Sequence, residues 1–320
     1  MKKIYISFLT TRLDLMKRHW EQHAALKEKG ISGTDKEIGR GIDLGGVLIE
    51  VDWDTKQILG EHPLSCPSGV CRWGDVLAVA SMRRNEIYLF DEQWHALRTI
   101  SHFALSDIHS MCVTRENSLL VVSSGVDGIV EFDRDGNCIW QWFAFDHGYT
   151  LDQFGETRAL DMSGKTDHRT LDYPTLRQTT HINSVMQHKD AKHSILATLF
   201  HQGTLVAIDK KTGIATTLMN GLHNPHSIRK RSDGYMVTDT KKGSILLLDE
   251  DFKIYDVLFS DTNWLQDAIQ ISGGNFLAGR SNENEIVELD SRTKQVISSF
   301  EYDKNWRIYQ IEEENFEARS

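Results

Sequence analysis

The sequence predicts an all-β protein, a six-bladed β-propeller, because one pattern of short strands repeats about every 40 residues. A small residue marks the first strand of each copy, and successive markers are 42, 74, 43 and 41 residues apart. The interval of 74 residues corresponds to one repeat plus an insertion of about 32 residues. The third strand of five copies ends in aspartate, in the segments Ile87–Asp91, Ile129–Asp133, Leu205–Asp209, Ile245–Asp249 and Ile286–Asp290.

The sixth blade is predicted to be divided between the two ends of the chain. Its strands, from first to fourth, are expected at Arg307–Ile311, Lys3–Phe8, Gly46–Asp52 and Gln57–His62. Such a blade joins the chain ends in one sheet, closes the ring and leaves no open sheet edge. We therefore expect residues 1–320 to form a single domain.

Two segments interrupt the repeat, and both are expected to cap the same mouth of the central channel. Residues 9–44 fall between the second and third strands of the divided blade and contain a predicted helix, Leu13–Lys29, ended by Gly30. Residues 143–180 fall between the third and fourth blades. Long loops in a compact domain are usually functional, so both are interpreted as lids.

Composition and charge exclude several classes of partner. The chain has 36 basic and 46 acidic residues, a net charge of −10, which disfavours nucleic acid and anionic membrane surfaces. No apolar run approaches the length of a membrane helix, and the N-terminus lacks a signal-peptide cleavage site. The four cysteines show no zinc-binding spacing and fit reduced thiols. We therefore expect a cytoplasmic protein that binds a small molecule; nothing indicates its oligomeric state.

Histidine is abundant, with 14 residues, and several copies are expected at the capped mouth. His109, His181 and His226 come from three successive blades at equivalent or nearly equivalent positions. Three imidazoles around one axis could hold a divalent transition metal, zinc or iron, with one coordination position left open. The same three could instead supply a nucleophile and its acid–base neighbours, or simply bind backbone groups.

Other polar residues are expected near the same mouth. Asp107 could orient the ring of His109. His201 and Arg280 are candidate catalytic residues. The candidate substrate-binding residues are Arg83, His147, Arg158, Arg177, Asn183 and Gln266. His19 and His23 are interpreted as solvated residues of the lid helix, and the repeated aspartates as turn residues of the opposite face.

The segments Ile139-Trp-Gln-Trp142, Phe145-Asp-His147 and His181-Ile-Asn-Ser-Val185 resemble the arylsulfotransferase propellers. That resemblance implies sulfuryl transfer between phenols, with His226 as nucleophile and His109 and His181 as supporting histidines. One departure is clear, because the stretch 198–202 lacks the arginine that the family carries there. Transfer of a sulfuryl group needs cationic stabilisation, which Arg280 or Arg83 would have to supply.

His109, His181 and His226 also look like the three-histidine metal site of peptidyl-hydroxyglycine lyases and related six-bladed propellers, which does not need that arginine. Our first expectation is therefore a metal-dependent enzyme, of lyase or hydrolase type, that acts on a small molecule. The alternatives are arylsulfotransferase-type transfer through His226 and a non-catalytic, ligand-binding propeller.

Overall fold

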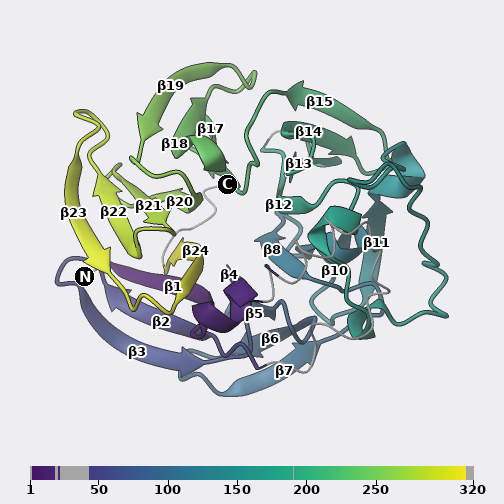
Figure 1. Ribbon diagram of the computed structural model, residues 1–320, viewed down its shortest axis with the longest axis horizontal. Helices are drawn as coiled ribbons and strands as arrows, with labels where there is room; N and C mark the ends of the chain where they lie inside the picture. The colour runs from purple at the N-terminus through teal and green to yellow at the C-terminus, as the bar shows by residue number, and fades with distance from the viewer. Residues whose placement is uncertain (1, 19–20, 22–42, 190, 315–320) are drawn as a thin grey trace.

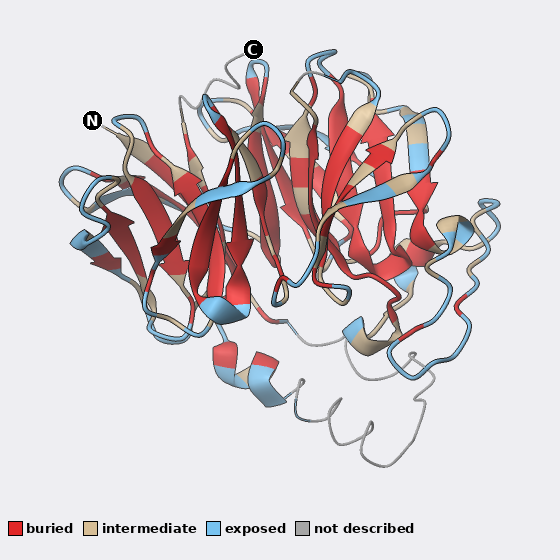
Figure 2. Cartoon of the chain, turned by 90° about the horizontal axis from the view of Figure 1, so that it is seen from above, coloured by how far each residue is buried: buried red, intermediate tan, exposed pale blue. Residues whose placement is uncertain are grey.

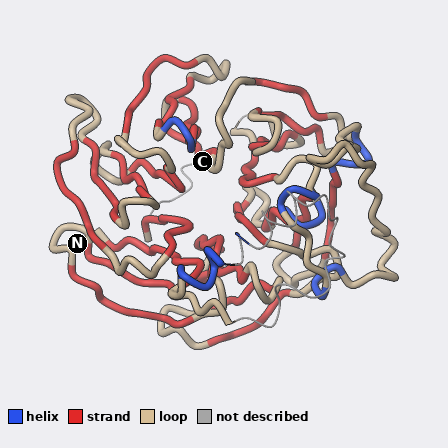
Figure 3. Tube along the Cα trace, viewed as in Figure 1, coloured by secondary structure: helices blue, strands red, loops and turns tan. Residues whose placement is uncertain are grey.

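The computed structural model describes residues 2–18, 21, 43–189 and 191–314 and shows a six-bladed β-propeller (Figure 1). Six four-stranded antiparallel sheets stand in a ring, as the repeat predicted. The first strand of each sheet lies nearest the axis and the fourth lies at the rim (Figure 1). The ring is built of strands joined by loops and turns, and the helical segments are short (Figure 3).

The blade that closes the ring consists of β24 (Arg307–Glu313), β1 (Lys3–Thr10), β2 (Val47–Asp52) and β3 (Gln57–Pro63). The second and third blades consist of β4 (Pro67–Trp73), β5 (Val76–Ser81), β6 (Glu86–Phe90), β7 (Ala96–Ile100), β8 (Ile108–Val113), β9 (Leu119–Ser123), β10 (Gly128–Phe132) and β11 (Cys138–Phe143). The remaining blades consist of β12 (Ile182–Gln187), β13 (Ser194–Leu199), β14 (Thr204–Asp209), β15 (Ala215–Met219), β16 (Ile228–Arg231), β17 (Gly234–Asp239), β18 (Ser244–Leu248), β19 (Ile254–Phe259), β20 (Leu265–Gln270), β21 (Phe276–Arg280), β22 (Glu285–Leu289) and β23 (Val296–Glu301).

The divided blade is confirmed, and apolar packing explains why it forms. Ile6 of β1 pairs with Ile311 of β24 on one side and with Ile49 of β2 on the other. All three side chains are fully buried in one apolar cluster that also includes Phe300 of the preceding blade. The two ends of the chain are therefore held together by the same hydrophobic burial that joins neighbouring blades.

The repeated aspartates form turns, as their repetition indicated. Oδ1 of Asp133 accepts the backbone N–H groups of Asp135 and Asn137 at 3.0 and 2.8 Å. The amide side chain of Asn137, together with these backbone groups, holds the pKa of Asp133 below its usual value. Asp91, Asp209, Asp249 and Asp290 each accept two backbone N–H groups in the same way.

Both insertions contact the channel mouth. Residues 13–18 are helical, and Leu13 and Met16 pack in an apolar cluster with Cys66 and Tyr309. Figure 2 shows this helical segment beyond one face of the ring of largely buried strands. Apart from residue 21, the rest of the predicted helix, with His19 and His23, lies outside the described residues.

The second insertion joins β11 to β12 and contains three short helical turns. These are η2 (Ala144–His147), η3 (His168–Thr170) and η4 (Thr175–Arg177). None of the described helices is long and apolar enough to cross a membrane. All four cysteines are free thiols.

Candidate functional site

One position of the inner strands recurs at the channel mouth in every blade. In β8 it is His109, which lies in an irregularity of the pairing with β9 between Ile108 and Met111. The pairing register of the first and second strands identifies the equivalent residue in each of the other blades. From the divided blade onward, the six residues are Tyr309, Ser68, His109, Asn183, His226 and Gln266. Five of them, all but Ser68, line a cavity of about 60 Å³ in the channel. His109 and His226 are thus truly equivalent, whereas Asn183 fills this position in the fourth blade.

His181 reaches the mouth from a different position, two residues earlier, which Asp107 occupies in the preceding blade. Both residues have left-handed backbone conformations, with φ of 47° for His181 and 55° for Asp107. This conformation is unfavourable for residues with a Cβ, so neighbouring groups must hold it.

The preceding blade provides that hold in both cases. Oδ1 of Asn85, in the turn after β5, accepts the backbone N–H of Asp107 at 2.7 Å. Asp127, at the equivalent place after β9, accepts the backbone N–H of His181 at 2.9 Å. Asp127 is fully buried and also accepts the N–H groups of Thr179 and Thr180, both at 2.8 Å. The end of the second insertion is therefore anchored where it enters β12.

The hydrogen bonds of the three histidines fix which ring nitrogen is free. Nδ1 of His109 lies 2.9 Å from the carbonyl oxygen of Asp107, and Nδ1 of His226 lies 3.1 Å from that of Asn224. A carbonyl only accepts, so each Nδ1 carries a proton, and Nδ1 of His226 also lies 2.8 Å from the hydroxyl of Thr240. In the neutral form of each ring the lone pair is therefore on Nε2.

His181 has the same tautomer. Its Nδ1 donates to Oε1 of Gln178, whose Nε2 donates to the carbonyl of Tyr173 at 2.8 Å. The second bond sets the orientation of the Gln178 amide. All three imidazoles can therefore bind a metal, accept a proton or attack an electrophile through Nε2.

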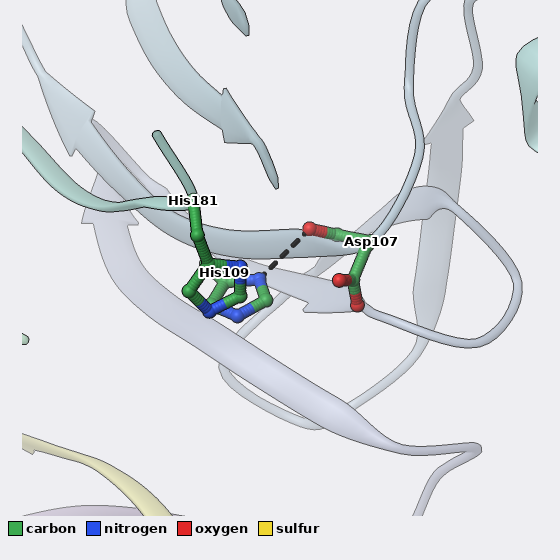
Figure 4. A group of neighbouring side chains, drawn as sticks. All are labelled: Asp107, His109 and His181. Atoms are coloured by element: carbon green, nitrogen blue, oxygen red, sulfur yellow. Dashed lines mark hydrogen bonds between the residues drawn. The ribbon is translucent and has the colours of Figure 1, made fainter. Parts of the chain in front are cut away.

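Asp107, His109 and His181 form a candidate metal-binding group (Figure 4). Their possible ligand atoms lie within 4.8 Å of one another. The two imidazole rings are nearly perpendicular, with centroids 4.6 Å apart. Within the described part of the chain, His226 does not belong to this group. Its expected role as a third histidine ligand stays a prediction, and Asp107, expected only to orient His109, takes the third place.

Burial sets the charge state of these groups. Burial, and then the neighbouring His109, keep the pKa of His181 well below its usual value. Burial lowers the pKa of His226 to about 3, with His109 and Arg307 adding to the effect. Burial also raises the pKa of the Asp107 carboxyl. A bound cation would reverse that last preference and stabilise the carboxylate.

Aromatic side chains also surround the histidines at the channel mouth, and the sequence did not lead us to predict them. Phe200 lies edge-on to both His181 and His226, with centroids 5.0 and 5.5 Å away. Trp264 lies 5.7 Å from His226, and Tyr309 lies 5.7 Å from His109. Tyr309 could have been found by counting, because it follows the equivalent Gln266 by 43 residues, one repeat.

Arg307 was also missed. Its guanidinium lies 5.8 Å above the ring of Trp264 and donates to Oδ1 of Asn282 at 3.2 Å. The first strand of the divided blade thus places a cation close to His226.

Three of the predicted polar residues lie beside the histidines. The ring of His201 is 5.7 Å from that of His181, and its Nε2 lies 2.9 Å from the carbonyl of Thr175 in the second insertion. Gln266 accepts the indole N–H of Trp264 at 2.9 Å. Asn183 donates to the carbonyl of Pro225, while its Oδ1 is buried without a partner.

Other predicted residues are engaged elsewhere in the protein. Arg158 pairs with Asp127 at 3.2 Å, and Arg280 pairs with Glu285 at 2.9 Å. Each of these two guanidinium charges is already balanced by an internal carboxylate. Arg177 is paired as well, with Asp152 and Glu156. His147 stacks on Trp142, with ring centroids 5.2 Å apart.

Comparisons with known proteins support the fold and assign no family. No family model matches the chain, and no curated protein matches it. A structure of a protein of unknown function from Bacteroides caccae has 13% identity and a TM-score of 0.61, covering 83% of this chain and 93% of its own. A chain of a nidogen/laminin complex has 11% identity and a TM-score of 0.62, covering 97% of both chains.

A virginiamycin B lyase from Staphylococcus aureus has 10% identity and a TM-score of 0.53, covering 82% of both chains. Identities this low show a shared fold alone. The comparisons support neither the arylsulfotransferases nor the peptidyl-hydroxyglycine lyases as relatives. What they establish is that the chain has the β-propeller fold.

Proposed function

We propose that the protein is a metal-dependent enzyme that acts on a small molecule by lyase-type or hydrolase-type chemistry. The observation that carries this proposal is the group of Asp107, His109 and His181, whose ligand atoms lie within 4.8 Å of one another. Lyases occur among the structural neighbours, which is consistent with the proposal but carries no catalytic residue over to this chain.

The donor set fits a divalent transition metal. Two neutral imidazoles and one carboxylate are ligands that zinc and iron accept, and three protein ligands leave a position for substrate or water. The ion would be held by the Asp107 carboxylate and by Nε2 of both His109 and His181. In this position it would supply Lewis acidity toward a substrate oxygen.

The surrounding residues would orient the substrate and limit access of water. Phe200, Trp264 and Tyr309 offer apolar surface around the histidines. The channel cavity lined by Tyr309, His109 and His226, about 60 Å³, has room for only a few water molecules. His226 has a free Nε2 beside this cavity and can accept a proton or a hydrogen bond from a bound substrate.

The test is the metal content and zinc affinity of the full chain. Protein purified without chelator should contain about one transition-metal ion per chain. His109→Ala and His181→Ala should each lower the zinc affinity at least ~100-fold, because each removes a ligand. His193→Ala, on an exposed loop, is the matched control and should leave the affinity unchanged.

A chain without metal, whose zinc affinity does not respond to His109→Ala, would contradict the proposal. Phenol release from an aryl sulfate, lost in His226→Ala, would then favour sulfuryl transfer through His226. Neither metal nor turnover would favour a ligand-binding propeller.

A further inference from the structure

The arginines expected at the mouth differ in how their charge is used. Arg158, Arg177 and Arg280 each form an ion pair with a carboxylate of the same chain. Arg83 differs because it forms no ion pair and no side-chain hydrogen bond with any of the residues that the structure describes. Its Nε is buried without a partner, as is the Nε of the ion-paired Arg280. A buried N–H without an acceptor costs free energy, so a ligand that supplies the acceptor gains that much in affinity.

The turn that carries Arg83 is attached directly to the candidate metal group. Asn85, two residues further on, accepts the backbone N–H of Asp107 at 2.7 Å. Met82, the residue before Arg83, packs against the apolar cluster that contains Cys66 and Tyr309. Arg83 is therefore held between two contacts with the channel mouth. The Arg83 guanidinium lies within electrostatic range of the Asp107 carboxyl and the Cys66 thiol.

We propose that Arg83 binds the carboxylate of the substrate, which is a small carboxylic acid with a second oxygen on the neighbouring carbon. This inference rests on the proposed function, because that second oxygen would be the one bound at Asp107, His109 and His181. The planar guanidinium presents two parallel N–H donors that match the two oxygens of a carboxylate.

The charges at the mouth favour a carboxylate over a phosphate. Asp107 lies in the same site, and the whole chain has a net charge of −10. Both repel a dianion more strongly than a singly charged carboxylate.

The experiment is a calorimetric titration of the zinc-loaded full chain with glycolate, which has one carboxylate and one neighbouring hydroxyl. Glycolamide, its uncharged amide, is the matched probe, and inorganic phosphate and sulfate are the competing anions. Wild type should bind glycolate about 10- to 100-fold more tightly than glycolamide, as expected for charge-assisted hydrogen bonds. Arg83→Gln should lose this preference, and Arg83→Lys should keep only part of it.

Arg84→Gln is the control variant, because Arg84 is the exposed neighbour of Arg83 in the same turn and should not affect glycolate binding. Equal glycolate affinities in wild type and Arg83→Gln would overturn the proposal. It would also be overturned if wild type bound phosphate or sulfate more tightly than glycolate, or did not bind glycolate.

Zinc affinity, measured on the same samples, separates this proposal from the proposed function. Arg83→Gln should bind zinc at least as tightly as wild type, because the substitution removes a like charge near the ion. If wild type binds no zinc, the proposed function fails, and the titration is repeated on metal-free protein. A preference for glycolate over glycolamide that needs Arg83 would then still support the carboxylate site, and its absence would overturn it.

Discussion

Two sets of equivalent residues recur around this propeller, and they behave in opposite ways. The turns after the third strands use the same residue, aspartate, in five blades, and each aspartate accepts two backbone N–H groups of its own turn. The mouth position of the inner strands holds five residue types in six blades: Tyr309, Ser68, His109, Asn183, His226 and Gln266. The turn has the same structural role in each of these blades, so the same residue type serves in all of them. A binding site on the channel axis instead needs different side chains from different blades.

The mouth contains a smaller repetition, which positions the candidate ligands. Asn85 and Asp127 occupy the same left-handed turn position in successive blades, with φ of 55° and 51°. Each holds the backbone N–H of a candidate ligand in the next blade, Asp107 or His181. Asn85 and Asp127 thus have the same structural role, and the residues that they hold are candidate metal ligands.

The largest expected effect comes from Asp127. Asp127→Ala removes a fully buried carboxylate that accepts three backbone N–H groups and pairs with Arg158. Because a buried guanidinium would remain without its carboxylate, urea denaturation should show a loss of about 3–5 kcal/mol in the free energy of unfolding. Zinc affinity should also fall, since the hold on His181 is lost.

Asn85→Ala is the matched comparison. It removes the hydrogen bonds of one neutral side chain, to Asp107 and Arg169, and should cost only about 1–2 kcal/mol. Similar losses in the two variants would show that the charge of Asp127 adds nothing, and would weaken the contrast between the two turns.

The fold could be predicted from the sequence because its signals are local and repeated. The spacing of the copies and the aspartates at the strand ends mark the blades, and the apolar strands at both termini reveal the divided one. Each signal reflects a contact that every blade makes in the same way, so one copy supports the next.

The sequence pointed to the part of the fold that holds the candidate site, but not to the arrangement of its residues. Histidine positions led to the mouth, yet the choice between His181 and Asn183 depends on a left-handed residue and a strand irregularity set by contacts from another blade. The role of Asp107 depends on the same backbone conformation. The pairing of Arg158 with Asp127 joins residues that only tertiary structure brings together, so free and paired arginines look alike in the sequence.

An intermediate effect is expected from His226 as the pH falls. Its pKa is about 3 in the folded protein and near 6.5 when unfolded, so below pH 6.5 the unfolded chain takes up a proton that the folded chain does not. This histidine should therefore make the protein progressively less stable between pH 6.5 and pH 3. The loss should reach about 2 kcal/mol at pH 5 relative to pH 8.

The measurement compares urea denaturation of chelator-treated wild type and His226→Asn at both pH values. The variant should lose about 2 kcal/mol less than wild type over this interval. His193→Asn, an exposed control, should follow wild type. Parallel losses in all three proteins would mean that His226 is not held neutral at the mouth.

The smallest effect should come from the repeated aspartates. Asp133→Ala removes hydrogen bonds from one exposed turn and should lower the thermal midpoint by only about 2 °C. Zinc and glycolate affinities should equal those of wild type, because the turn lies on the opposite face from the histidines. A change in either affinity would show that the turns and the mouth are coupled, and their division into a structural and a functional set would fail. Unchanged affinities in Asp133→Ala, beside losses in Asp127→Ala, would show that two aspartates of one blade serve these two separate tasks.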